Sequence, residues 1–276
     1  MNNELNKTSL DTLCASLAYA YGIEPPAQAA KANEELNAFI DQAFGGSGKV
    51  DRIFMYNPDA VAQWIYEKYP YFSREVKALG DIEIPFCTVM PSVTPVCFGT
   101  MYTGAQPEVH GIRKYEKPVI KIDTLFDALL RAGKKCALVT HGQCSLSKIY
   151  LEREMDYFNF PSIPEANAKA AELIIADEHD FILCYNGNYD ARMHRSGPED
   201  AESLAELKAN SYAFAEFCRL IENNWQSHNT LLGYAMDHGC HPIDGDNEKQ
   251  YVGSHGLDMP EDLNILHTYK AIKATK

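Results

Sequence analysis

From residue 52 onward, short uninterrupted runs of hydrophobic residues alternate with amphipathic stretches of helical length. Continuous apolar runs are typical of strands that a parallel sheet buries on both faces. They predict strands over residues 52–57, 82–90, 135–141, 180–186 and 229–237. Helical periodicity between the runs predicts helices over residues 59–69, 124–133, 165–177 and 199–225.

Before residue 52 the pattern is helical only. Residues 9–22 and 26–44 are predicted to form two helices, separated by Pro25-Pro26 and followed by Gly45-Gly46. We therefore expect an N-terminal helical segment, residues 1–46, packed on a single domain over residues 47–276. The alternation of strands and helices in that domain predicts an α/β fold, a three-layer α/β/α sandwich with a mostly parallel central sheet.

Composition and charge narrow the function classes. Of 276 residues, 46% are hydrophobic and 23% charged, and the net charge of −13 disfavours nucleic-acid polymers as partners. None of the eight cysteines forms a C-x-x-C pair, which argues against a thiolate zinc site and fits a reducing compartment. There is no signal-peptide pattern and no apolar run of membrane-spanning length, so the expected location is cytoplasmic, away from membranes.

Polar side chains follow the predicted strands. In a parallel sheet, ligands bind beyond the carboxyl ends of the strands, so these residues are the site candidates. They are carboxylates, imidazoles and one hydroxyl, namely Asp59, Thr94, Asp190, His194, Asp237, His238 and His255. Oxygen and nitrogen ligands without thiolates suit Zn²⁺, Mn²⁺ or Fe.

Each candidate also has a purely structural interpretation. Asp59 could cap the helix that follows it, and Asp190 and His194, four residues apart, could form a surface pair on one helix face. His255 could be exposed in its Gly-flanked turn. Because independent caps and turns would scatter over both edges of the sheet, their shared placement at one edge favours a metal site.

The stretch PSVTPVCFGTMYTG, residues 91–104, allows two interpretations of its first threonine. Thr94 sits where a helix N-cap is expected, before Pro95 and with Gly104 as a natural helix end. The same position would put the hydroxyl at a helix N-terminus, which favours anions, so Thr94 is also a candidate nucleophile.

These segments together resemble the alkaline phosphatase superfamily, most closely its nucleotide pyrophosphatase/phosphodiesterase branch. The similar segments are FMYNPDA, PSVTPVCFGTMYTGAQPEVHGI, DARMHRSGP, MDHG and GSHG, which lie between about residues 52 and 258. The second and third are the most specific. The resemblance implies an alkaline phosphatase-like fold with a minimal cap domain or none, because only sixteen residues separate His238 from His255.

The resemblance also implies two divalent metal ions, usually zinc, and a small phosphorylated substrate. By matched position, Asp190, His194 and His255 would bind one ion, and Asp59, Asp237, His238 and the Thr94 hydroxyl would bind the other. Thr94 would be the nucleophile that cleaves a phosphodiester or pyrophosphate through a phospho-threonine intermediate. A phosphomonoesterase, a phosphonate hydrolase and a non-catalytic protein that binds a phosphorylated ligand remain as alternatives.

Two positions depart from the family pattern. The first ligand usually lies in an Asp-Gly turn, but here Ala60 follows Asp59. The position three residues after the nucleophile usually carries an Asn that binds the phosphoryl group. Here that substrate-binding position is Cys97, whose thiol is a poor hydrogen-bond donor.

Overall fold

A central sheet of seven strands organises the molecule, in the order β2-β9-β6-β1-β5-β3-β4. The computed structural model describes residues 4–245 and 247–275. Strand β9 is antiparallel to both of its neighbours, and the remaining pairs are parallel. The strands are β1 (Arg52–Pro58), β2 (Ile82–Cys87), β3 (Cys136–His141), β4 (Asp156–Phe160), β5 (Phe181–Asn186), β6 (Thr230–Tyr234) and β9 (Asn264–Ile272).

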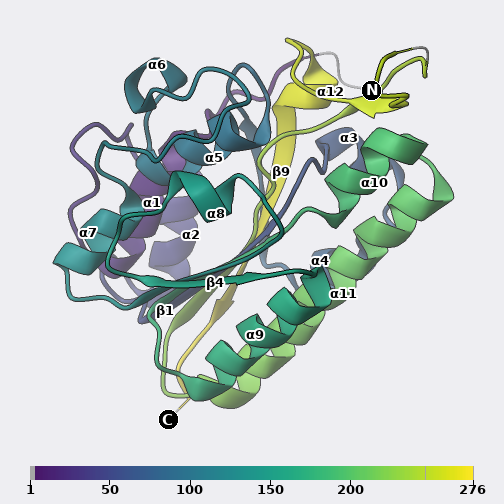
Figure 1. The fold of residues 1–276 in the computed structure, drawn as a ribbon. Helices are drawn as coiled ribbons and strands as arrows, with labels where there is room; N and C mark the ends of the chain where they lie inside the picture. The colour runs from purple at the N-terminus through teal and green to yellow at the C-terminus, as the bar shows by residue number, and fades with distance from the viewer. Residues whose placement is uncertain (1–3, 246, 276) are drawn as a thin grey trace.

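Helices cover both faces of this sheet (Figure 1). One layer contains α1 (Thr12–Tyr21), α2 (Glu34–Phe44), α5 (Thr94–Thr103), α6 (Pro107–His110), α7 (Leu125–Arg131) and α8 (Leu146–Ile149). The other contains α4 (Arg74–Leu79), α9 (Ile163–Ala176), α10 (Asn188–Ser196) and α11 (Ala201–Asn224). Short elements complete the fold: α3 (Gln63–Lys68), α12 (Pro260–Leu263), and the two-stranded β7 (His241–Pro242) and β8 (Gly253–Ser254). The predicted three-layer α/β/α sandwich is confirmed.

The N-terminal helices share the core of the sheet domain. Leu13, Leu17 and Ile40 are fully buried in the same hydrophobic cluster as the residues of β1 and β5. Helix α1 contacts α5 and α7, so it forms part of the layer that carries the PSVTPVCFGTMYTG segment. Among the residues described, no helix is long and apolar enough to cross a membrane.

Two strands of the central sheet, β4 and β9, were not predicted from the sequence. Strand β4 lies at the sheet edge and is only half-buried, so its sequence DYFNF contains no continuous apolar run. Strand β9, NILHTYKAI, carries buried polar side chains such as His267, whose Nε2–H donates to the Met236 carbonyl at 2.7 Å. Such a strand does not resemble the apolar parallel strands on which the prediction relied.

Several predicted boundaries are corrected. The helix expected from residue 26 begins at Glu34, because Asn33 caps it by accepting from the Leu36 N–H at 2.8 Å. The helix expected from Asp59 begins at Gln63, since Ala60 adopts a left-handed φ of 60° that a helix cannot contain. The strand predicted to end at residue 90 ends at Cys87.

Candidate metal centre

The parallel strands β1, β5 and β6 all end at the same edge of the sheet, and the candidate ligands follow them there. Asp59 follows β1 directly, Asp190 lies in the first turn of α10 after β5, and Asp237 follows β6. His255 comes from the turn after β8, which packs on α10. The side chains gather into two groups of three that could each hold a metal ion.

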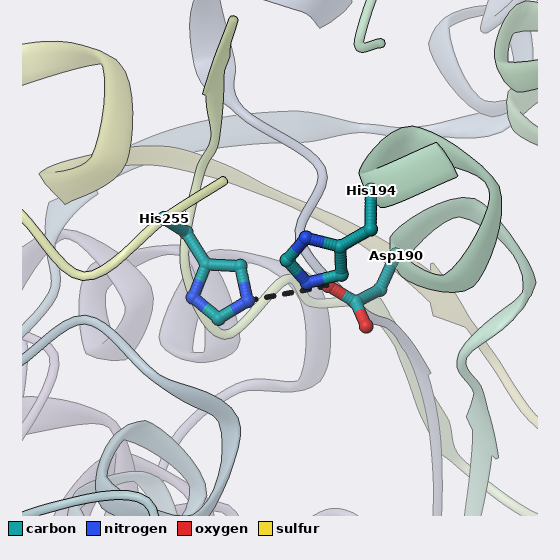
Figure 2. A group of neighbouring side chains, drawn as sticks. All are labelled: Asp190, His194 and His255. Atoms are coloured by element: carbon teal, nitrogen blue, oxygen red, sulfur yellow. Dashed lines mark ion pairs between the residues drawn. The ribbon is translucent and has the colours of Figure 1, made fainter. Parts of the chain in front are cut away.

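The first group consists of Asp190, His194 and His255 and lies at the surface of a cavity (Figure 2). Asp190 Oδ1 is 3.3 Å from His194 Nε2 and 3.4 Å from His255 Nε2. His194 Nδ1 lies 2.9 Å from the Gly253 carbonyl, and His255 Nδ1 lies 3.0 Å from the Ser92 carbonyl. A proton on each Nδ1 satisfies these carbonyls and leaves both Nε2 lone pairs for a cation.

The second group consists of Asp59, Asp237 and His238, and all three side chains are buried. His238 Nε2 lies 3.4 Å from Asp59 Oδ1 and 3.4 Å from Asp237 Oδ2. Its Nδ1 is 2.9 Å from the Gly239 carbonyl, so Nε2 again faces the carboxylates. Thr94 Oγ1 completes the group at 3.4 Å from His238 Nε2 and 3.4 Å from Asp59 Oδ2.

These separations fit a bound cation better than hydrogen bonds. Side-chain hydrogen bonds are typically shorter, at about 2.7–3.0 Å. By contrast, tetrahedral ligands about 2.0–2.1 Å from a Zn²⁺ ion lie about 3.3 Å from one another. Asp190 Oδ1 and Asp237 Oδ2 are also buried with no hydrogen-bond partner among the described residues. The donor atoms of both groups therefore fit a divalent ion.

The pKa shifts of the candidate ligands also favour a bound cation. Burial and the charge of Asp190 raise the pKa of Asp59 to about 7, and burial together with the Asp59 charge raises the pKa of Asp237. Burial and the neighbouring His255 lower the pKa of His238. The chain holds carboxylates together where their negative charges repel each other, and a cation between them would remove that repulsion.

Backbone geometry links the two buried carboxylates. The Ala60 N–H donates to Asp237 Oδ1 at 3.2 Å, so the turn after β1 contacts the residue that follows β6. Ala60 makes this contact with its φ of 60°, the region that glycine adopts without steric cost. The departure from the Asp-Gly pattern therefore places an alanine in a conformation that favours glycine.

Thr94 is not the N-cap of its helix. Val93 occupies that position and Thr94 is the first helical residue, so the prediction of a capping threonine is wrong. Its side chain is buried and its hydroxyl lies beside Asp59 and His238. The proline at the start and the left-handed Gly104 at the end agree with the sequence pattern.

A cavity of about 740 Å³ opens beside the first group and reaches Thr94. Its walls also carry Tyr115, Tyr251, Arg195 and Lys249. The Tyr251 ring stacks on His194 with centroids 4.6 Å apart, and the Lys249 ammonium lies 5.5 Å from the Tyr251 ring centroid. Arg195 and Lys249 place two positive charges beside the candidate site, on a cavity wall that also carries Glu248.

Other residues noted in the sequence have structural roles. Cys97 is fully buried and its thiol lies 3.9 Å from the Val89 carbonyl, so its predicted substrate contact stays untested and its burial argues against it. His110 Nε2 lies 3.1 Å from Thr100 Oγ1 and stabilises the turn after α5. His241 pairs with Asp262 at 2.7 Å.

One hydrogen bond to a candidate ligand was not predicted from the sequence. The Tyr185 hydroxyl, at the end of β5, donates a hydrogen bond to Asp59 Oδ2. In the sequence this tyrosine belongs to the apolar run FILCYN, and nothing there distinguishes it from a core residue. Only the register of β1 against β5, which pairs Asn57 with Tyr185, brings its side chain next to Asp59.

Comparison with solved structures identifies the fold. No family model and no curated protein matches the sequence. Human ectonucleotide pyrophosphatase/phosphodiesterase 5 is similar, with a TM-score of 0.64 at 11% identity, over 80% of this chain and 87% of that one. An inactive murine form of that protein in complex with AMP gives a TM-score of 0.61 at 12% identity, over 80% of this chain and 88% of that one.

A second kind of protein is also similar. Phosphonoacetate hydrolase from Sinorhizobium meliloti 1021, in complex with phosphonoformate, gives a TM-score of 0.54 at 16% identity. The alignment covers 71% of this chain and 59% of that one. Both kinds of protein are members of the alkaline phosphatase superfamily, and the chain described here has the fold of that superfamily.

Proposed function

We propose that the protein is a two-metal phosphohydrolase with Thr94 as its nucleophile. The observation that carries the proposal is the position of Thr94. Its hydroxyl lies 3.4 Å from His238 Nε2, beside the buried group, and the residue also lines the cavity bordered by the half-buried group of Asp190, His194 and His255. One hydroxyl thus contacts the buried candidate ion site and borders the cavity that Asp190, His194 and His255 also line, where a substrate can bind.

Divalent cations at the two groups would lower the pKa of the Thr94 hydroxyl and would neutralise negative charge on the phosphoryl oxygens. Asp59, Asp237 and His238 with Thr94 Oγ1 would make a closed set of four ligands. Asp190, His194 and His255 would provide only three, which leaves a position open toward the cavity. Zinc suits both sets, and Mn²⁺ or Fe are alternatives.

The chain's own residues account for the reaction steps. Thr94 Oγ1 forms a bond to phosphorus and its proton passes to solvent. The bond from phosphorus to the leaving oxygen breaks, and that oxygen departs with the electron pair and takes up a proton from solvent. Water then breaks the bond between Oγ1 and phosphorus, which releases the phosphate product and restores the hydroxyl. The N-terminus of α5, where Thr94 is the first residue, favours the negative charge of the phosphoryl group throughout.

Substrates are expected to be small and to carry negative charge beyond the reacting phosphoryl group. Arg195 and Lys249 line the cavity and make no ion pair with the described residues, whereas Arg192 on the same helix pairs with Glu202 at 2.8 Å. A nucleotide pyrophosphate would satisfy this requirement. A phosphonocarboxylate of the kind named for the bacterial neighbour would do so as well, which keeps the phosphonate hydrolase as second candidate.

The deciding experiment measures turnover of p-nitrophenyl phosphate, bis-p-nitrophenyl phosphate and phosphonoacetate by protein loaded with Zn²⁺ or Mn²⁺. We expect Thr94→Ala to lower kcat by about 1000-fold or more, and Thr94→Ser to retain part of it. A matched control is Thr140→Ala, which removes a buried hydroxyl that contacts Asn159 instead. Equal rates for wild type and Thr94→Ala would refute the nucleophile. Binding of phosphate without any turnover by wild type would identify a non-catalytic binding protein.

A further inference from the structure

The Tyr185 hydroxyl contacts only one of the two oxygens of the Asp59 carboxylate, so the two oxygens have different roles. Asp59 Oδ2 accepts the hydrogen bond from the Tyr185 hydroxyl, and Oδ1 faces His238 Nε2 at 3.4 Å. The tyrosine side chain is buried, with 4% of its surface exposed. One oxygen of Asp59 is therefore fixed by the protein, and the other is presented to the space among Asp237, His238 and Thr94.

The hydroxyl fits beside Gly187 because glycine has no side chain there. A Cβ atom on Gly187 would lie 2.7 Å from the Tyr185 hydroxyl oxygen, closer than real Cβ atoms approach. Gly187 has a φ of −98°, which any residue can adopt, so the backbone conformation does not require glycine there. The need for a glycine at this position comes from the hydroxyl.

Two other rings pack against the tyrosine ring. The His141 ring stacks on it with centroids 5.5 Å apart and an interplanar angle of 12°, and Phe98 packs against it edge-on at 5.7 Å. The Gly187 N–H donates to His141 Nε2 at 3.0 Å. Burial lowers the pKa of His141, which favours the neutral ring that this acceptor role needs. Ring, hydroxyl slot and histidine thus form one rigid support behind Asp59.

We infer that Tyr185 is a positioning residue for the buried metal site, holding Asp59 so that Oδ1 points at the ion. The inference rests on the proposed function, since it assigns Asp59 as a ligand. Partners that orient metal ligands typically contribute about 10–100-fold to metal affinity. Among the described residues no comparable hydroxyl donates to Asp190, whose Oδ1 faces His194 and His255. The effect should therefore be confined to one of the two sites.

The test is Tyr185→Phe, which removes the hydroxyl and keeps the ring. Zinc affinity is measured by competition with a chromophoric chelator, together with the zinc content after dialysis. We expect the variant to lose about 10–100-fold in affinity at one site and none at the other. Its kcat should recover when free zinc is raised. The matched control is Tyr102→Phe, another buried tyrosine, whose hydroxyl donates to Asn57 Oδ1 at 2.8 Å.

A second variant guards against a folding defect. Gly187→Ala keeps the Tyr185 hydroxyl but displaces it from its slot, so it should weaken the same site. The inference is overturned if both variants bind two ions as tightly as wild type, or if Tyr102→Phe weakens zinc binding equally. Failure of the proposed function has a different signature, because wild type itself would then fail to bind two ions.

Discussion

Replacing Asp59 by asparagine should stabilise the metal-free protein while it removes the buried metal site. Asparagine has the shape of aspartate but no charge, and it can still accept the hydrogen bond from Tyr185. In the native chain, burial and the Asp190 charge raise the pKa of Asp59 from 3.8 to about 7. Without a cation, ionising this carboxyl therefore costs folding free energy.

The size and sign of the effect follow from linkage. Because the folded-state pKa lies above the unfolded value, the folded protein holds its proton more tightly, and stability falls as pH rises between the two values. The penalty is absent below pH 3.8 and complete above about pH 7. A separation of about three pH units corresponds to about 4 kcal/mol at pH 8, and the penalty at pH 5 is less than half of that. The Asp59→Asn variant escapes this penalty.

Urea unfolding in EDTA at pH 5 and pH 8 measures the difference. We expect Asp59→Asn to exceed wild type by up to about 4 kcal/mol at pH 8 and by less at pH 5. With zinc at saturation the order should reverse, because the ion at the buried site stabilises only the protein that retains that site. Asp258→Asn, at an exposed aspartate, is the control and should show neither effect. A metal-free wild type that stays the more stable protein at pH 8 would refute the reasoning.

Two further substitutions test the cavity and the candidate metal site of Asp190, His194 and His255. Arg195→Ala should raise KM for phosphonoacetate more than for its amide analogue, which lacks the carboxylate charge, with little change in kcat. Arg192→Ala should change neither KM, and equal KM ratios in all three proteins would contradict the assignment. Gly253→Ala brings a Cβ within 2.4 Å of the Met193 carbonyl oxygen and displaces the carbonyl that orients His194. The substitution should lower the free energy of unfolding in urea by about 1–3 kcal/mol and weaken zinc binding at the site of Asp190, His194 and His255. Unchanged zinc affinity would count against the orienting role of the Gly253 carbonyl.

The sequence predicted β1, β3, β5 and β6 because each lies in a continuous apolar run, and strand ends then indicated where polar residues gather. Asp59, Asp190 and Asp237 could be proposed as neighbours on that ground alone. The helix N-cap at Thr94 was mistaken because local pattern does not distinguish a capping residue from the first residue of the helix. Val93 takes the cap without a side-chain hydrogen bond.

Residues that act through the register of the sheet could not be predicted. Tyr185 reaches Asp59 only because β1 and β5 are paired in one register, and Gly187 is needed only because that hydroxyl approaches it. The cavity wall is formed partly by Tyr115 and Lys249, more than 130 residues apart in the chain. Such contacts depend on packing that residue type alone does not encode.

The unequal burial of the two groups has a consequence for how the site operates. Asp59, Asp237 and His238 are buried, so a cation there would exchange only when the surrounding core opens. Asp190, His194 and His255 border the cavity, so a cation there would exchange directly with solvent. Since Thr94 belongs to the buried set and the substrate enters from the cavity, the slowly exchanging ion would activate the nucleophile. The exchangeable ion would meet the substrate, and a weak chelator should therefore remove it first.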